Sequence, residues 1–328
     1  MKRREFIGLI SSAAVAPSLL PLAARAQQAS NIPKLGALHP TRSENVAAFI
    51  AGLTNAGYVD GQNVRIETRI YGTKLDQLDR LGDIADELVN LQCKAIFAAG
   101  PYAIRAALKA TSIIPVVGID LESDPVANGW ITSLSRPGGN LTGTFLDLPE
   151  LSGKQIELLR ETLPTLTRLG IIWDSTIGSA QFHAAENGAR AAGIELQSFP
   201  IQSSADFENA FHLAKIKGVD GIIILSSPII FGERVRLGEL TLNARLPTIS
   251  LFNQFPRFGM LMAYGPSLPA MYKRAALYID QVFRGTKAGE IPIERPTRFE
   301  LAINLKTAKA LGLTIPPELL LRADEVIE

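Results

Sequence analysis

The stretch Gly221-Ile222-Ile223-Ile224-Leu225 decides the fold class, because it is apolar throughout and mostly β-branched. β-Branched residues favour strands, and successive side chains of a strand point to opposite faces of its sheet. A strand that is apolar on both faces is buried on both, as in parallel sheets covered by helices on each side. The stretch therefore predicts an α/β protein with parallel, doubly wound sheets.

The same unit of strand and helix repeats before and after this stretch. Apolar runs and helical periodicity predict strands at residues 34–38, 64–70, 95–98 and 115–119, separated by helices at 44–56, 75–91 and 102–111. The turn-rich segment Arg136-Pro137-Gly138-Gly139-Asn140 interrupts this rhythm. It resumes with helices at 150–163, 180–192, 206–215 and 233–244 and strands at 168–173, 194–199, 220–225 and 248–251. The interruption predicts two Rossmann-like lobes.

The C-terminal part of the chain predicts more than one connection between the lobes. A strand at 260–264 and a helix at 269–283 precede a Pro-rich link and a further strand at 298–304. A simple tandem pair of lobes would need a single linker. We expect one lobe to comprise residues 33–145 plus 266–289, and the other to comprise 146–263 plus 294–328.

The first 26 residues indicate where the protein works. Lys2-Arg3-Arg4-Glu5-Phe6-Ile7 precedes a weakly apolar run, and Ala24-Arg25-Ala26 supplies the small-x-small pattern of a cleavage site. The run contains serine and proline and is shorter than the ~20 apolar residues of a membrane span, which argues against an anchor. We expect a secretory signal, cleaved near Ala26, and a periplasmic protein. The paired arginines are typical of Tat export, although Sec signals also begin with Lys and Arg.

Charge and cysteine content exclude several classes of partner. The full chain carries 33 Lys+Arg and 32 Asp+Glu, a net charge of +1. The signal holds Lys2, Arg3, Arg4 and Arg25 against Glu5, so 1 − 3 leaves −2 for the mature chain. No basic face for nucleic acid is expected. Cys93 is the single cysteine and is expected to be a buried apolar residue. We expect a monomer.

The sequence gives little support for catalysis. It contains no GxSxG, HExxH or GxxxxGK motif, and no GxGxxG after a strand. His183 and His212 lie in predicted helices, where surface positions are more common than a shared metal site. We therefore expect no catalytic residue, no metal and no cofactor.

Candidate ligand-binding residues follow the strands, since doubly wound sheets bind ligands at the carboxyl ends of their strands. Each alone is explained by ordinary loop chemistry, but together they predict an aromatic cleft with a few polar groups. The candidates are His39, Thr41, Gly100, Pro101, Tyr102, Asp120, Asp124, Trp173, Ser226, Phe252 and Tyr264.

The aromatic candidates suggest a clamp. We expect Tyr102 and Trp173 to flank an apolar part of the ligand from opposite lobes. Asp124 or Asp120 would meet a donor group, and Ser226 would add a hydroxyl contact. The alternative places Trp173 in the core of its lobe.

Several blocks, in order, resemble the family of ABC-transporter substrate-binding proteins that includes tryptophan-binding members. They are Gly57-Tyr58-Val59-Asp60-Gly61-Gln62-Asn63-Val64, Asp124-Pro125-Val126, residues 136–143, Tyr264-Gly265-Pro266-Ser267 and residues 299–313. The resemblance implies a type I periplasmic-binding fold, with two lobes joined by three crossovers that close on a ligand. It also implies an ABC permease in the inner membrane as partner. Two rim segments depart from the family pattern, namely Gly100-Pro101-Tyr102 and the expanded turn 117–125. The resemblance therefore does not predict which ligand this chain binds.

Two functions remain open from the sequence. The leading hypothesis is a periplasmic binding component of an ABC importer, which captures a small organic ligand such as an amino acid or an aromatic or carboxylate compound. The alternative is a secreted enzyme on the same two-lobed scaffold, since a fold does not fix a function.

Overall fold

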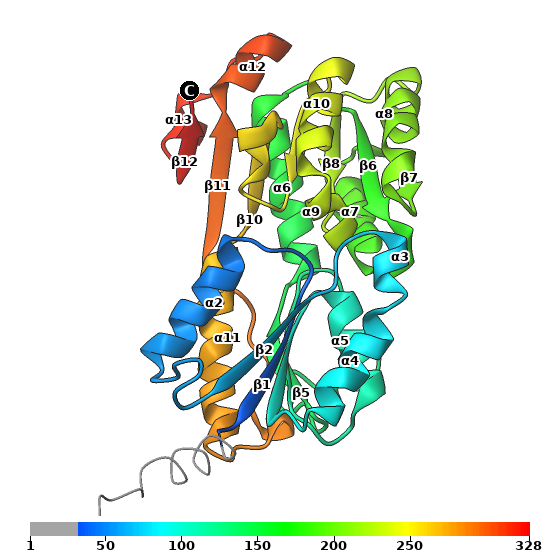
Figure 1. Cartoon of the computed structure of the whole chain (residues 1–328). Coiled ribbons are helices and arrows are strands. Elements are labelled where there is room, and N and C mark those ends of the chain that lie inside the picture. Colours follow the sequence, from blue (N-terminus) through cyan, green and yellow to red (C-terminus); the bar gives the residue numbers. More distant parts are fainter. Residues whose placement is uncertain (1–31) are drawn as a thin grey trace, which may run out of the picture.

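The computed structural model describes residues 32–328, so the predicted signal lies outside the described residues. The chain forms two sheets, each with helices on both faces (Figure 1). The first sheet has the order β2-β1-β3-β4-β5 and is parallel throughout. Its strands are β1 (Lys34–His39), β2 (Arg65–Ile70), β3 (Ala95–Ala99), β4 (Val116–Asp120) and β5 (Leu141–Phe145). We call this sheet with its helices lobe 1.

Alternation along the central strands builds the two cores of lobe 1. Phe97 packs on one face with Phe49, whereas Ile96 packs on the other with Leu88 and Ile104. The first face is covered by α2 (Glu44–Asn55) and α11 (Leu268–Phe283), and the second by α4 (Leu81–Asn90) and α5 (Pro101–Ala110). The single helix expected at 75–91 is in fact α3 (Leu75–Leu78) followed by α4. Gln77 Oε1 accepts the backbone N–H of Thr73 and of Lys74, which fixes the start of α3.

The second sheet has the order β12-β11-β10-β9-β8-β6-β7, and we call it with its helices lobe 2. The pairing of β10 with β11 is antiparallel and the other pairings are parallel, so β11 and β12 run opposite to the remaining strands. The strands are β6 (Arg168–Asp174), β7 (Glu195–Ile201), β8 (Gly221–Ile224), β9 (Thr248–Ser250), β10 (Met262–Pro266), β11 (Phe299–Asn304) and β12 (Glu325–Ile327). Strand β8 is buried at every position, with Ile222 and Ile223 in different cores, as its apolar sequence predicts.

Helices cover both faces of the second sheet (Figure 1). Ile223 packs with the helices α6 (Leu148–Thr162), α7 (Ala180–Ala191), α12 (Leu305–Leu311) and α13 (Pro317–Leu320). Ile222 packs on the opposite side with α8 (Phe207–Ile216), α9 (Pro228–Gly232) and α10 (Arg234–Ala244). Short 3₁₀ turns lie at η1 (Ser175–Ile177), η2 (Ser204–Asp206), η3 (Phe255–Phe258) and η4 (Ala288–Glu290). The observed class is the predicted one, α/β with parallel sheets.

The chain passes between the lobes three times. It leaves lobe 1 between β5 and α6, returns between β10 and α11, and leaves again between η4 and β11. The three segments lie together, because Phe145 N donates to Glu294 O (3.0 Å) and Ser267 N donates to Arg298 O (3.1 Å). Helix α11, from the C-terminal third of the chain, packs directly on α2. These bundled segments connect the two lobes.

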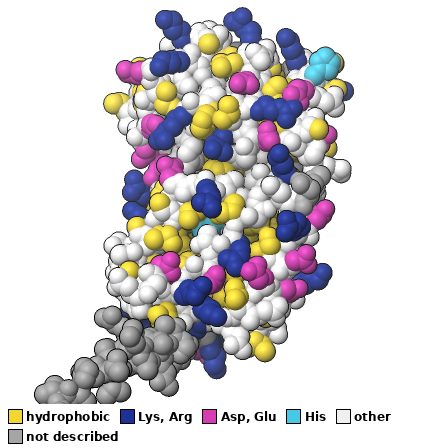
Figure 2. Space-filling view, viewed as in Figure 1, with side chains coloured by type: hydrophobic (Ala, Val, Ile, Leu, Met, Phe, Trp, Pro, Cys, Tyr) yellow, Lys and Arg dark blue, Asp and Glu magenta, His cyan; other side chains and the backbone are white. Residues whose placement is uncertain are grey.

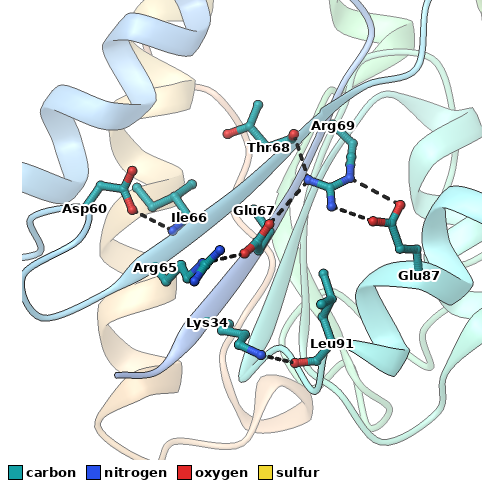
Figure 3. Close-up of polar contacts among 9 residues, drawn as sticks. All are labelled: Lys34, Asp60, Arg65, Ile66, Glu67, Thr68, Arg69, Glu87 and Leu91. Atoms are coloured by element: carbon teal, nitrogen blue, oxygen red, sulfur yellow. Dashed lines mark hydrogen bonds and ion pairs between the residues drawn. The ribbon is translucent and has the colours of Figure 1, made fainter. Parts of the chain in front are cut away.

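The surface carries mixed charges. On the face seen in Figure 2, Lys and Arg side chains alternate with Asp and Glu. The edge strand β2 presents Arg65, Glu67 and Arg69, and the last of these pairs with Glu87 of α4 at 2.6 Å (Figure 3). Charged edges of this kind oppose pairing with another sheet. Within residues 32–328, no helix has the length and apolar content needed to cross a membrane. Cys93 is buried and unpaired, as expected.

Candidate functional site

A cavity lies between the two lobes, where strands of both sheets end. Its free space is about 480 Å³ when the open mouth is included. We call it the inter-lobe cavity. Lobe 1 lines it with Pro40, Thr41, Ser43, Asn45, Ala99, Gly100, Ile119, Leu121, Glu122, Leu268 and Tyr272, and lobe 2 with Ser227, Pro228, Phe231 and Phe252.

The backbone of the first sheet explains why these residues meet. Strands β1, β3 and β4 are parallel and adjacent, so the residues that follow them converge at one edge. Gly100 follows β3 with φ +89°, a conformation that favours glycine. A Cβ atom there would also lie 3.5 Å from Pro228 Cγ of lobe 2. The lobes therefore approach closely at this rim.

Two buried carboxyl groups sit on the lobe 1 side, at the end of β4. Glu122 lines the cavity, and Asp120 lies directly behind it, fully buried. Asp120 Oδ1 accepts the backbone N–H of Glu122 (2.8 Å) and of Ser123 (3.1 Å). Burial raises the pKa of both carboxyls, and the pKa of Glu122 stands well above its usual range because burial and the neighbouring Asp120 act together. This pair is the strongest electrostatic feature of the cavity.

Two further polar side chains of lobe 1 are buried without partners. Asn45, 3% exposed, lies in the first turn of α2 and lines the cavity, and its Oδ1 has no hydrogen-bond partner in the described part of the chain. His39 lies behind the lining, with its ring 5.2 Å from Phe97 and 6.0 Å from Tyr272. Burial lowers the pKa of His39 to about 4, so the imidazole is neutral at pH 7.

The lobe 2 side of the cavity is aromatic. Phe231 of α9 and Phe252, just after β9, line the cavity with their ring centroids 4.9 Å apart. Phe255 supports Phe252 from behind at 5.0 Å. Every charged or amide side chain in the lining comes from lobe 1, and both phenylalanines come from lobe 2. We call these the polar wall and the aromatic wall.

Hydrogen bonds connect the lobes around the cavity. Ser226 Oγ, at the end of β8, donates to Glu122 Oε1. At the rim, Tyr102 Oη donates to Asp174 Oδ2 (3.2 Å) and lies 2.5 Å from Thr176 Oγ1. These contacts describe a molecule whose lobes are closed upon each other.

The structure brings together most, but not all, of the candidates from the sequence. Thr41, Gly100 and Phe252 line the cavity. Another group lies immediately behind the lining or at the rim, namely His39, Pro101, Tyr102, Asp120 and Ser226.

Three candidates lie elsewhere. Trp173 points to the other face of β6, because strand side chains alternate: it stacks on Phe182 at 4.9 Å and donates to Ser198 Oγ at 2.9 Å. Asp124 is exposed and accepts the backbone N–H of Val126 and of Ala127, a local turn. Tyr264 stacks on Phe299 at 5.6 Å, near the segments that connect the lobes.

Twelve of the fifteen lining residues are not among the candidates, and five of them show why. Asn45, Leu268 and Tyr272 lie in helices, where apolar periodicity or capping explained them without a ligand. Phe231 belongs to α9, a helix that the sequence did not predict. Glu122 had a detectable signal, because its spacing of two from Asp120 places both carboxyls on one side of an extended segment. No cluster of metal-ligating side chains occurs within residues 32–328.

Comparison with known proteins identifies the family. A model of the ABC transporter substrate binding protein family matches residues 37–327. A tyrosine-binding protein of Clostridioides difficile is 25% identical over 279 residues, which are 84% of this chain and 78% of the relative. A Streptococcus pneumonia ABC domain in complex with L-Trp has a TM-score of 0.82 at 21% identity, covering 90% of this chain and 100% of the other.

A ligand-free, open substrate-binding protein from Clostridium difficile has a TM-score of 0.67 at 20% identity, covering 90% of this chain and 99% of the other. These likenesses show that the fold is shared. The family model spans nearly the whole described chain and both walls of the cavity. The chain therefore belongs to the family of ABC transporter substrate binding proteins.

Proposed function

We propose that this chain is the solute-capturing component of an ABC importer, which holds a small organic ligand in the inter-lobe cavity. The observation that carries the proposal is the composition of the cavity, since four of its lining residues come from lobe 2 and the others from lobe 1. A ligand there contacts both walls only when the lobes are closed. Ligand binding therefore shifts the population toward the closed form, by hinge rotation of the lobes.

The two lobes of this mechanism follow the boundaries expected from the sequence. We assign residues 33–145 plus 266–289 to lobe 1 and residues 146–263 plus 294–328 to lobe 2. The connections at 145–148, 266–268 and 291–298 then act as the hinge. The backbone bonds between them, from Phe145 to Glu294 and from Ser267 to Arg298, support a hinge that moves as one unit.

The relatives suggest an amino acid or a similar compound as ligand. One of them is a tyrosine-binding protein, and another is an ABC domain in complex with L-Trp. An aromatic or branched apolar body fits against Phe231 and Phe252, and a polar head fits against Asn45 and Glu122. Delivery to an inner-membrane permease, in the periplasm, completes the proposed role.

A binding screen that also measures shape tests the proposal. Thermal unfolding with amino acids, aromatic acids and small carboxylates should reveal a ligand that raises Tm as expected for binding to the folded state. Small-angle scattering should then show a more compact average shape with that ligand. The ligand must be recovered chemically unchanged. Recovery of a converted product would support the secreted enzyme instead, and a ligand that leaves the shape unchanged would contradict hinge closure.

A further inference from the structure

The polar wall of the inter-lobe cavity contains an excess of hydrogen-bond acceptors. Glu122 is 6% exposed and Asn45 is 3% exposed, and both line the cavity. Asn45 Oδ1 and Asp120 Oδ2 have no hydrogen-bond partner within residues 32–328. Buried acceptors normally have partners, and each one left unpaired costs about 1–3 kcal/mol. Asn45 lines the cavity, so a ligand with a donor group would supply the partner that its Oδ1 lacks.

The charge of the cavity points in the same direction. Glu122 is the one charged residue in the lining, and no Lys or Arg lines the cavity. Within the described chain, neither Asp120 nor Glu122 takes part in a salt bridge. The nearby imidazole of His39 is neutral at pH 7 and supplies no positive charge. Without a cation nearby, burial and Asp120 hold the pKa of Glu122 well above its usual range, so the pair retains a proton. A cationic group entering the cavity would stabilise the ionised form of the pair.

We propose that the ligand of this cavity carries a protonated amine, and that the Asp120–Glu122 carboxyl pair is its counter-ion. The inference rests on the proposed function, because it concerns the same cavity. Glu122 meets the amine directly, and Asp120 acts behind it. Asn45 Oδ1 accepts a further N–H of the same group. The body of the ligand lies against Phe231 and Phe252, whose ring faces also favour a cation.

Ligands with a protonated amine are of two kinds, amino acids and simple amines without a carboxylate. Both contain the donor that the polar wall lacks. Carboxylic acids without an amine do not belong to the class, since they would place a second negative charge beside Glu122. The inference therefore excludes one of the ligand classes that the sequence left open.

Two matched sets of probes test the inference by thermal shift and calorimetry. One set is phenethylamine, phenylalanine and hydrocinnamate, and the other is isoamylamine, leucine and isocaproate. One of the two sets should have an apolar body that fits the cavity. Within that set, we expect a member with an amine to raise Tm and the acid without an amine to leave Tm unchanged. The amine and the amino acid together distinguish the two sources.

The outcomes separate this inference from the proposed function. If hydrocinnamate or isocaproate binds as well as its amine counterpart, the inference is wrong and solute capture stands. If no member of either set binds while a compound without an amine binds in the wider screen, the inference alone is wrong.

A variant locates the counter-ion. Glu122→Gln keeps the volume and removes the ability to ionise beside the amine, so the affinity for the bound amine should fall about tenfold or more. The Tm of the ligand-free protein should stay unchanged or rise, because a buried carboxyl with an unfavourable environment is lost. Glu157→Gln makes the same change in an exposed pair with Lys154 and should alter neither quantity. Unchanged affinity in Glu122→Gln would overturn the inference, and Asp120→Asn repeats the test if Glu122→Gln fails to fold.

Discussion

The two walls of the inter-lobe cavity meet the same space with opposite chemistry. The polar wall of lobe 1 brings Asn45 and Glu122, with Asp120 and His39 buried behind them. The aromatic wall of lobe 2 brings Phe231 and Phe252, supported by Phe255. Polar contacts need fixed geometry, whereas apolar contact tolerates many shapes. The comparison suggests that lobe 1 selects the ligand and lobe 2 covers it.

The largest expected effect is a loss of stability when Phe252, which supports the aromatic wall from within lobe 2, is replaced. Phe252 is 5% exposed and contacts Phe231 and Phe255, so Phe252→Ala should lower the free energy of unfolding by about 3–5 kcal/mol. Urea unfolding measures this loss, and Phe252→Leu should lose much less. A stable Phe252→Ala protein would show that even this residue serves the ligand and not the core of lobe 2.

The stability of the protein should depend on pH through His39, which lies behind the polar wall. Its pKa is about 4 in the folded protein against an unperturbed value of 6.5, so the unfolded state binds a proton first as pH falls. The contribution to stability is therefore complete above pH 6.5 and is lost between pH 6.5 and 4, by about 3 kcal/mol.

Unfolding at pH 7 and at pH 4.5 checks this loss. His39→Phe should flatten the profile over that range, because the ring remains but no longer titrates. An unchanged profile in His39→Phe would show that other groups control the acid sensitivity of lobe 1.

The surface of the aromatic wall should affect binding more than stability. Phe231 is half-buried and lines the cavity, so Phe231→Ala should weaken a ligand found by the screen by about 1–3 kcal/mol. Trp173→Ala is the matched control, since its ring packs on Phe182 away from the cavity. It should cost stability without changing the affinity of folded molecules, as calorimetry can measure. Weaker binding in Trp173→Ala would return that residue to the site.

The smallest effect concerns the bonds that connect the two lobes. Tyr102→Phe removes the hydroxyl that meets Asp174 and Thr176, at a cost of about 0.5–1.5 kcal/mol to the closed form. Stopped-flow measurements should show this loss as faster release of the ligand. Tyr58→Phe also removes one hydroxyl, but its bond to Asp280 joins α11 to the turn after α2 within lobe 1. Equal release rates for the two variants would show that Tyr102 does not hold the lobes together.

The sequence predicts the fold far better than the site, for a physical reason. Apolar runs such as 221–225 are buried wherever the lobes lie, so their pattern predicts parallel sheets directly. A site depends on the side to which each residue points. Trp173 is the last residue of the expected strand but faces away from the cavity, while its neighbour Asp174 meets Tyr102 across the rim. Asn45 and Tyr272 reach the cavity from helices far apart in the chain, and no local pattern predicts that meeting.

The position of helix α11 has a consequence for how the molecule is made. Phe49 and Leu53 of α2 belong to the core that α11 completes, yet α11 begins only at Leu268. A growing chain cannot finish lobe 1 until more than two hundred later residues have followed β1. Contacts this distant in sequence slow folding and leave apolar surface exposed meanwhile. A nascent fragment that stops before Leu268 should therefore bind chaperones and resist cooperative folding, although it contains all five strands of the first sheet.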